Sequence, residues 1–258
     1  MYMNRSFLSI LLFTLIILNS SAQNIDSTIF SDIENTNWKR RFYNTADSLE
    51  HISDSIRELR QSNLEKHVLS LKNNYSSLNE LSRDLLKPAI NDSEKIWLIF
   101  RWITNNIAYD CEEYHKTDLT YKQEVFYDPR HNHFKNIDSL NGVNTFKKRK
   151  GVCEDYADLF KTLCDINHLT CEKIDGYTEK GKDVSRKSKE NLSSNHAWNI
   201  VQIHTLWYMI DATWASGYAD QNVTVFTKHF QPDYYLTPIN EGYPDHCANK
   251  SRLKKLGL

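Results

Sequence analysis

The chain has 258 residues, enough for one large domain or for a domain with an accessory segment. Its 32 basic and 33 acidic residues nearly balance, which argues against a nucleic-acid binder, because such proteins carry a basic excess or stripe. Six tryptophans, fourteen tyrosines and eleven phenylalanines can build a large core, whereas seven glycines and five prolines are too few for a low-complexity chain. We therefore expect a globular protein.

The N-terminus is typical of a secretory signal peptide over residues 1–22. Arg5 precedes an apolar run over residues 7–18, and the small residues Ser20 and Ala22 follow at the −3 and −1 positions of the predicted cleavage site. The apolar run is short for a transmembrane helix, although an uncleaved anchor is the alternative. We predict an exported protein, periplasmic, at the cell surface or secreted, with no membrane span after cleavage.

The chain contains five cysteines, an odd number for an oxidising compartment, so at least one thiol is free or paired with another molecule. They are Cys111, Cys153, Cys164, Cys171 and Cys247. No C-x-x-C pair or Cys/His cluster has zinc-ligand spacing, so we expect no structural metal. His131 and His133 form an H-x-H pair that could bind a metal, but it lacks acidic or cysteine partners at fitting spacing, and we predict no metal and no cofactor. Cys164 lies about three helical turns beyond Cys153 and is expected to be a buried core thiol. The sequence does not indicate how Cys111, Cys171 and Cys247 pair.

Amphipathic helices are predicted in the first third of the mature chain. Residues 23–76 are polar and carry apolar residues at helical spacing. They form either an accessory arm for a partner or helices that simply pack on the main domain. Capping patterns at Ser77 and Asn91, each with a glutamate three residues later, predict two further helix starts. The second of these helices, which carries apolar residues from Ile96 to Ile107, is apolar on most sides and is expected to be buried.

The second half of the chain predicts a loop, a helix and then strands. Residues 111–149 show no clear period and are interpreted as a long loop, and the basic run 147–150 at its end is also expected to lie in a loop. A helix over 153–164 and a strand over 171–177 follow. Residues 196–203 and 206–211 are predicted to form an antiparallel hairpin. Because His-Thr is poor turn chemistry, we expect its loop to be a residue or two longer than the two residues between the strands.

Three residues in this half have the chemistry of an acyl-transfer site. Cys153 begins a helix just behind Gly151, and the unpaired N–H groups and dipole of a helix N-terminus favour a reactive thiolate. Symmetric pairing of the hairpin puts Trp198 opposite Asp211, with His196 one diagonal step away. A slip of two residues puts His196 directly opposite Asp211. In either register the imidazole and the carboxylate share a face, with about 5–8 Å between backbone positions.

A carboxylate fixes the tautomer of an imidazole and stabilises its charged form. Together with the cysteine, the pair supplies a nucleophile, a base and an orienting group. Each residue also has a structural interpretation: His196 as a partly buried strand histidine and Asp211 as the cap of the following turn. A chance occurrence of all three residue types in this arrangement is much rarer than any one of them alone, so we expect the three to act together.

Four sequence stretches resemble the transglutaminase-like superfamily, and in particular its bacterial and kyphoscoliosis-peptidase-like branch. They are "EKIWLIFRWITNNIAYD", "GVCEDYADLF", "NHAWNIV" and "WYMIDATWASG". The resemblance covers about residues 78–235. It implies an α+β, papain-like cysteine-protease fold in which the nucleophile helix packs on an antiparallel sheet, here with N-terminal helices. It also implies that Cys153 is the nucleophile, His196 the general base and Asp211 the residue that orients it.

The chain departs from animal transglutaminases around the nucleophile. Val152 and Glu154 stand where those enzymes carry a Gln and a Trp, and the chain has no room for their additional β-domains. We therefore expect acyl-transfer chemistry but not protein crosslinking. The predicted segments are a signal peptide (1–22), a helical segment (23–76), a catalytic domain (77–240) and a C-terminal tail (241–258).

The predicted function is hydrolysis of peptide or amide bonds through a thioester, with a protein or a cell-wall peptide as the substrate. The oxyanion is expected to bind the Cys153 backbone N–H and a second donor, for which Tyr109 is the candidate; packing is its alternative role. Trp198 and Trp214 are expected to wall the site. Two other functions remain open: a protein–glutamine γ-glutamyltransferase, and a catalytically retired peptide- or partner-binding module. No nucleic-acid partner is expected, and the oligomeric state is not indicated.

Overall fold

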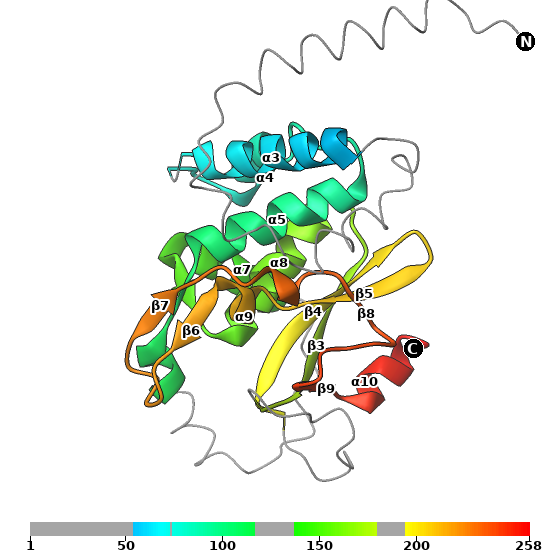
Figure 1. The fold of residues 1–258 in the computed structure, drawn as a ribbon. Coiled ribbons are helices and arrows are strands. Elements are labelled where there is room, and N and C mark those ends of the chain that lie inside the picture. Colours follow the sequence, from blue (N-terminus) through cyan, green and yellow to red (C-terminus); the bar gives the residue numbers. More distant parts are fainter. Residues whose placement is uncertain (1–53, 73, 117–136, 180–193) are drawn as a thin grey trace, which may run out of the picture. The chain divides into compact units, whose positions relative to one another are not determined.

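The computed structural model describes residues 54–72, 74–116, 137–179 and 194–258. The predicted signal peptide, the part of the helical segment before residue 54 and the charged stretch 180–193 lie outside the described residues. The elements, in chain order (Figure 1), are α3 (Asp54–Ser70), α4 (Leu78–Leu85), α5 (Asp92–Asn106), β1 (Ala108–Tyr109), α7 (Ile137–Lys148), β2 (Lys150–Gly151), α8 (Cys153–Ile166), β3 (Cys171–Thr178), β4 (His196–Ile203), β5 (Leu206–Ile210), α9 (Ala212–Ser216), β6 (Gly217–Ala219), β7 (Phe226–Lys228), η5 (Pro232–Tyr234), β8 (Thr237–Pro238), β9 (His246–Ala248) and α10 (Lys250–Lys255). Among the described helices, none has the length and apolar character needed to cross a membrane.

A five-stranded sheet organises the part of the chain that holds the candidate site. Its strand order is β8–β5–β4–β3–β9, and every neighbouring pair is antiparallel. The central strand β4 is buried along its length except at Gln202, which is half-buried. Helix α8 packs against β4 and β3 (Figure 1). This arrangement confirms the predicted α+β architecture, in which the helix that begins at Cys153 packs on an antiparallel sheet.

Strands β4 and β5 form the predicted hairpin in the symmetric register. Asn199 pairs with Ile210, so continuing the ladder brings Trp198 opposite Asp211. Only two residues connect the strands, and the expectation of a longer loop is therefore wrong. His204 adopts the left-handed φ of 55° that such a tight turn requires and that glycine or asparagine usually supplies. Pairing along both strands stabilises the turn despite this unfavourable residue.

Both predicted capping patterns begin helices. The side chain of Ser77 accepts a hydrogen bond from the backbone N–H of Glu80 (3.2 Å) ahead of α4. The side chain of Asn91 accepts one from Glu94 (2.9 Å) ahead of α5. Helix α4 ends at Leu85.

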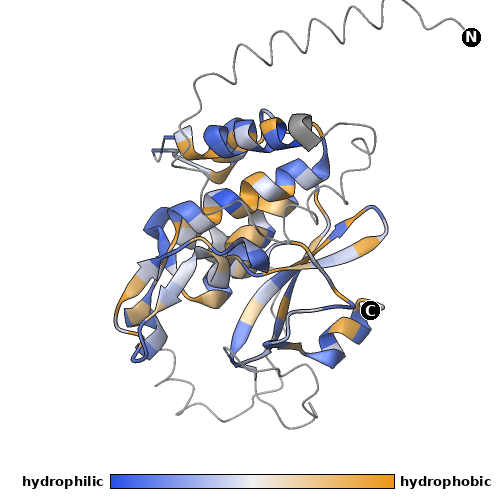
Figure 2. Ribbon diagram, in the orientation of Figure 1, coloured by the Kyte–Doolittle hydropathy of each residue, from blue (hydrophilic) through white to orange (hydrophobic). Residues whose placement is uncertain are grey.

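Helix α5 is buried on all sides, as its sequence predicts. The four consecutive residues 96–99, which cover more than one turn, are each at most 1% exposed. Phe100 packs against Tyr235 with ring centroids 4.8 Å apart, and Trp97 meets the same ring edge-on at 5.0 Å. Hydrophobic residues follow α5 along much of its length (Figure 2). Helices α8 and α9 both contact α5, so α5 forms the part of the core on which these two helices pack.

The segment before Cys153 is not the continuous loop that the sequence analysis expected. Residues 111–116 are helical, and residues 137–148 form α7, which packs closely on α8. The absence of an apolar period has a structural cause: the contact position of α7 is Gly142, where a Cβ would lie 2.3 Å from Oγ1 of Thr162. A small residue at the closest approach weakens the apolar pattern by which a helix is recognised.

The basic run 147–150 is divided between the end of this helix and the start of β2, with Arg149 between them. Lys147 and Lys148 occupy the last turn of α7, where positive charge interacts favourably with the helix dipole. Residues 117–136, with the other part of the expected loop, lie outside the described residues.

Helix α3 packs on α5 and belongs to the same compact unit. Leu64 and Val68 are almost completely buried. Glu65 accepts a hydrogen bond from Nε of Arg101 (2.6 Å) in a buried ion pair between the two helices. For residues 54–70, the structure therefore favours helices packed on the main domain over a free arm.

Residues 241–258, which were expected to form a tail, contribute β9 and α10 to this unit. His246 of β9 pairs with Thr178 of β3 at the edge of the sheet. The close approach depends on Gly176, because a Cβ there would lie 2.4 Å from the carbonyl oxygen of Cys247 and 2.5 Å from the ring of Trp198.

Candidate active site

Cys153 is the first residue of α8 and is half-buried. Asp155 stabilises this helix start, since its Oδ2 accepts a hydrogen bond from the backbone N–H of Val152 (2.9 Å). To do so, the Asp155 side chain folds back over Gly151, where a Cβ would lie only 2.4 Å from the Cβ of Asp155. The glycine in G-V-C-E-D is therefore required for space. It lets β2 lead directly into a helix whose first N–H groups have no partner within the helix.

Tyr109 lies beside this helix start. Its strand β1 pairs in parallel with β2, and Tyr109 is the direct partner of Gly151. Burial raises the pKa of the Tyr109 hydroxyl, and the charge of Cys153 raises it further. The phenol is thus close enough to Cys153 to interact with it electrostatically.

Asn199 joins the helix of Cys153 to the strand of His196. Its side-chain Nδ2 donates a hydrogen bond to the backbone oxygen of Ala157 in α8 (3.0 Å), and Asn199 is 1% exposed. This bond spans from the second turn of α8 to the middle of β4. It limits how far the cysteine and the histidine can move relative to each other.

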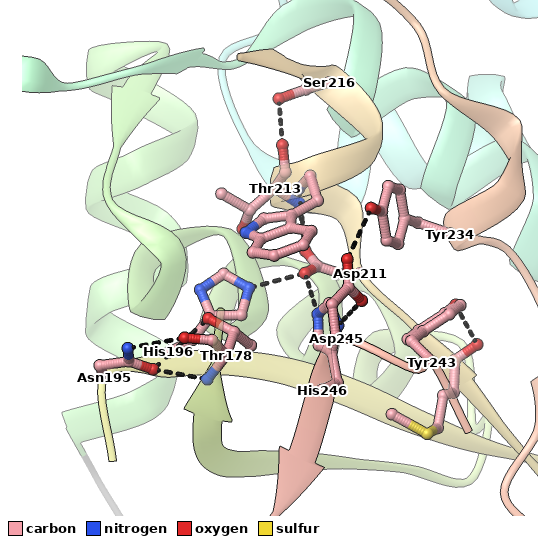
Figure 3. Close-up of polar contacts among 12 residues, drawn as sticks. Thr178, Asn195, His196, Asp211, Thr213, Ser216, Tyr234, Tyr243, Asp245 and His246 are labelled. Carbon is pink, nitrogen blue, oxygen red and sulfur yellow. Dashed lines mark hydrogen bonds and ion pairs between the residues drawn. The ribbon is translucent and has the colours of Figure 1, made fainter. Parts of the chain in front are cut away.

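His196 and Asp211 are brought into direct contact. Nε2 of His196 lies 2.6 Å from Oδ2 of Asp211 (Figure 3), and both side chains are buried. Asp211 is at the same time the N-cap of α9, because its Oδ1 accepts hydrogen bonds from the backbone N–H groups of Thr213 (2.9 Å) and Trp214 (3.0 Å). The sequence offered the capping of α9 and the contact with His196 as alternative roles for Asp211. The structure has both, one on each carboxylate oxygen.

The electrostatics of the pair depend on neighbouring charge. Burial alone would lower the pKa of His196, but the negative charges of Asp211 and Cys153 and hydrogen bonds to both raise it to about 10. Because Nε2 faces Asp211, the remaining ring nitrogen, Nδ1, is the one available to Cys153. Burial would raise the pKa of Asp211, but His196 and hydrogen bonds from His196 and His246 outweigh it and hold that pKa well below its usual range. The imidazole therefore keeps its proton easily beside a charged carboxylate.

The two tryptophans predicted to wall the site differ in exposure. Trp214 is half-buried, and its ring centroid lies 5.5 Å from that of His196. Trp198 is 1% exposed and stacks 5.9 Å from the imidazole within a core cluster that includes Ile174 and Met209. Trp198 supports the histidine from inside the core, whereas Trp214 also reaches the surface.

A fourth polar residue, His246, was missed by the sequence analysis. Its Nε2 lies 3.0 Å from Oδ2 of Asp211, the same oxygen that His196 contacts, and its Nδ1 lies 2.7 Å from Oδ1 of Asp245 (Figure 3). The only local signal was the Asp-His pair itself, in a segment assigned to the tail. Its position next to Asp211 depends on the pairing of β9 with β3.

The same three residues offer one group of possible metal-ligand atoms. Among the described residues, His196, Asp211 and His246 place such atoms within 4.8 Å of one another. These atoms are already joined through hydrogen bonds to Oδ2 of Asp211. A metal ion would compete with His196 for its carboxylate partner, so the donor set fits a hydrogen-bonded proton-transfer site better than a metal centre.

The five cysteines are present as free thiols. Cys164 is fully buried, which confirms its predicted place in the core, and Cys171 and Cys247 are buried as well. Cys111 and Cys153 are half-buried. Burial, together with the charges of Asp220 and Asp110, raises the pKa of the Cys111 thiol. Of these two half-buried thiols, Cys153 is the one that interacts with a histidine, His196.

Comparison with known proteins adds sequence relationships to this geometry. Residues 76–218 match the model of the family described as "Transglutaminase-like domain". Kyphoscoliosis peptidase of Mus musculus is 32% identical over 175 residues, and that of Homo sapiens is 29% identical over 175 residues. Each alignment covers 66% of this chain but only 24% of the relative. A solved structure of a candidate cysteine protease from Cytophaga hutchinsonii is 17% identical and covers 70% of this chain and 55% of that one, with a TM-score of 0.34.

Proposed function

Because the chain belongs to the transglutaminase-like family, we propose that it is a thiol-dependent acyl-transfer enzyme that hydrolyses peptide or amide bonds. Cys153, His196 and Asp211 are its nucleophile, general acid–base and orienting residue. The observation that carries this proposal is the buried 2.6 Å contact between His196 and Asp211, with Cys153 interacting with the same imidazole. Such a set supplies every group that nucleophilic acyl transfer needs.

In the first half of the reaction, His196 takes the thiol proton and the Cys153 sulfur attacks the carbonyl carbon of the substrate. A carbon–sulfur bond forms, and the carbonyl oxygen becomes an oxyanion. The imidazolium of His196 then donates its proton to the leaving nitrogen. The carbon–nitrogen bond breaks, an amine departs, and a thioester on Cys153 remains. Asp211 holds the imidazolium in the orientation that allows this transfer.

In the second half, water replaces the amine. His196 removes a proton from the water as its oxygen attacks the thioester carbon. The carbon–sulfur bond then breaks, the carboxylic acid leaves, and the proton on His196 balances the thiolate that is regenerated. The oxyanion of each half is stabilised by the backbone N–H of Cys153 and by a second donor, for which the hydroxyl of Tyr109 is our candidate.

Hydrolysis is favoured over transfer to an amine by the relatives, whose names describe peptidases. The matched region is about a quarter of their length, so their substrates are not carried over to this chain. We propose a protein or a cell-wall peptide as the substrate class. We also propose export, on the basis of the signal-peptide features of residues 1–22. Protein sequencing from the N-terminus of the protein released by its host cells tests this; a first residue at 23 supports export.

A labelling experiment combined with product analysis tests the activity. The purified protein is treated with limiting iodoacetamide, and each cysteine is quantified by mass spectrometry. We expect selective modification of Cys153, with loss of hydrolysis of a labelled casein in step with modification. Cys153→Ala should be inactive. Cys111→Ala is the matched control, because Cys111 is the other half-buried thiol, and it should retain activity.

The products separate the alternatives. New N-termini on casein support hydrolysis, whereas incorporation of a fluorescent primary amine into casein supports γ-glutamyl transfer. Labelling that falls on Cys111 or Cys247 while Cys153 stays unmodified contradicts the proposed nucleophile. Tight peptide binding without turnover at any pH, with Cys153 unreactive, indicates a binding module instead.

A further inference from the structure

Asp211 makes more contacts than a triad requires. One oxygen, Oδ1, accepts two backbone hydrogen bonds from the first turn of α9. The other, Oδ2, contacts Nε2 of His196 at 2.6 Å and Nε2 of His246 at 3.0 Å (Figure 3). A carboxylate has about four acceptor positions, so this one is fully occupied. His246 supplies the contact that the proposed reaction does not use.

The second ring nitrogen of His246 also faces a carboxylate. Nδ1 lies 2.7 Å from Oδ1 of Asp245, and Oδ2 of Asp245 accepts a hydrogen bond from the hydroxyl of Tyr234 at 3.3 Å. Ionised carboxylates only accept hydrogen bonds, so each nitrogen of His246 must donate one. The ring therefore lies between two carboxylates with both of its nitrogens engaged, and its side chain is fully buried.

The titratable groups form one series from the thiol inward. Cys153 faces His196, His196 faces Asp211, Asp211 faces His246, and His246 faces Asp245. The two imidazole rings are 5.6 Å apart between centroids. Besides His196 and the two carboxylates, the described titratable groups near His246 include the phenols of Tyr234 and Tyr243, with ring centroids at 5.9 and 5.0 Å, and the thiol of Cys247, the next residue of β9. The indoles of Trp198 and Trp214 complete the enclosure.

We propose that His246 and Asp245 are positioning residues that hold Asp211 for His196 and share its negative charge. This inference rests on the proposed function of Cys153 and His196. His246 has two effects. Its hydrogen bond keeps Oδ2 of Asp211 aimed at the catalytic imidazole. Its positive charge weakens the attraction between Asp211 and the proton of His196, which makes that proton easier to donate to the leaving amine.

The test compares two variants that separate these effects. His246→Gln keeps an N–H group near the position of Nε2 but removes the charge, whereas His246→Leu removes both. His229→Gln is the matched control, because His229 is exposed and is not part of the site. For each protein, kcat and KM for labelled casein are measured across pH. Cys153 alkylation and thermal unfolding are followed in parallel.

We expect His246→Leu to lower kcat about 10- to 100-fold with little change in KM, the range usual for a partner that orients a reacting group. His246→Gln should recover most of this loss. Because it lacks the positive charge, its alkaline limb should lie about one pH unit higher than that of the wild type. A residue that served stability alone would lower the unfolding temperature without moving this limb. If His246→Leu does not fold, the Gln variant still tests the effect of the charge, through the position of its alkaline limb.

The outcomes are distinguishable. If the wild type is active and both variants match it in kcat and in pH profile, the positioning inference is overturned and the proposed function stands. A change in KM alone also overturns the inference. If the wild type neither hydrolyses substrate nor reacts at Cys153, the proposed function fails, and the inference that rests on it fails as well.

Discussion

Nε2 of His196 lies 2.6 Å from Oδ2 of Asp211, which joins the first residue of β4 to the residue that follows β5. Asp211 also begins α9 through its other oxygen. Two backbone amides of α9 therefore fix the direction of the Asp211 carboxylate independently of its contact with His196. The local start of a short helix and the tautomer of the proposed acid–base residue depend on the same side chain.

Asp211→Asn should leave the fold intact but remove most activity. Asparagine can still cap α9 with its oxygen, but its NH2 group then faces Nε2 of His196. Since an amide nitrogen only donates, Nε2 must give up its proton and Nδ1 must carry one toward Cys153. We expect kcat to fall by about 10³- to 10⁴-fold, as for wrong-tautomer variants of other triads. Steady-state kinetics measure the loss, and circular dichroism checks the fold.

Asp165→Asn is the control for this change, because Asp165 is an exposed aspartate of α8 whose ion pair with Lys161 is local. It should keep wild-type kinetics. Full activity in a folded Asp211→Asn protein would contradict the orienting role.

Stability and activity should both decline at high pH. The pKa of His196 is raised to about 10 in the folded protein, whereas the pKa of histidine in an unfolded chain is about 6.5. A raised pKa means that the stabilisation is complete below about 6.5 and is lost as the pH rises through about 10. The proposed acid loses its proton over the same upper range. We expect the urea midpoint and kcat to fall together toward pH 10.

The lowered pKa of Asp211 gives a stabilisation with the opposite pH dependence. Its contribution is present above about pH 4, where an unfolded aspartate is ionised, and is lost as the pH falls further. Activity is therefore expected to be bell-shaped, with limits that belong to the coupled groups. Unfolding curves of His196→Phe, compared with the wild type from pH 6 to 11, should lack the alkaline decline. A rate that rises steadily into alkali would contradict this protonation scheme.

Tyr109→Phe tests the second oxyanion donor. The phenol lies within electrostatic reach of Cys153, and Phe keeps the ring while removing the hydroxyl. If the hydroxyl binds the oxyanion, kcat should fall about 10²- to 10³-fold while KM and the alkylation rate of Cys153 stay near wild type. Tyr114→Phe is a suitable control, because its ring packs 6.3 Å from that of Tyr109. Unchanged kcat assigns Tyr109 to packing alone.

Asn199→Ala should loosen the link between the nucleophile helix and the central strand. It removes the buried bond to the oxygen of Ala157, and we expect a loss of about 1–3 kcal/mol in unfolding free energy. Activity should fall more than stability explains, because Cys153 and His196 are then free to shift. Urea denaturation and kcat measure the two effects.

The matched control for Asn199 is Asn106→Ala. Asn106 also donates to a backbone oxygen, that of Trp102, but this bond lies within α5. It should cost less stability and leave kcat unchanged. Equal effects of the two substitutions would argue against a positioning role for Asn199.

The sequence by itself determined the features that depend on short-range interactions. Ser77 and Asn91 mark helix starts because a cap needs only a side chain and an amide three residues away. Alternation along two neighbouring strands left two hairpin registers open, but both place His196 and Asp211 on one face of the sheet; the structure has the symmetric register. The residue types at Cys153, His196 and Asp211 indicated acyl-transfer chemistry, and all three lie within residues 76–218, which match the transglutaminase-like family model.

Only the tertiary structure decided what depends on distant segments. Helix α7 was hidden because Gly142, a residue without a side chain, occupies its closest contact with α8. His246 reaches Asp211 because β9 pairs with β3, about seventy residues earlier in the chain. Nothing local to residues 245–248 indicates that pairing. Long-range strand pairing is selected by the packing of the whole core, and a local pattern contains little information about it.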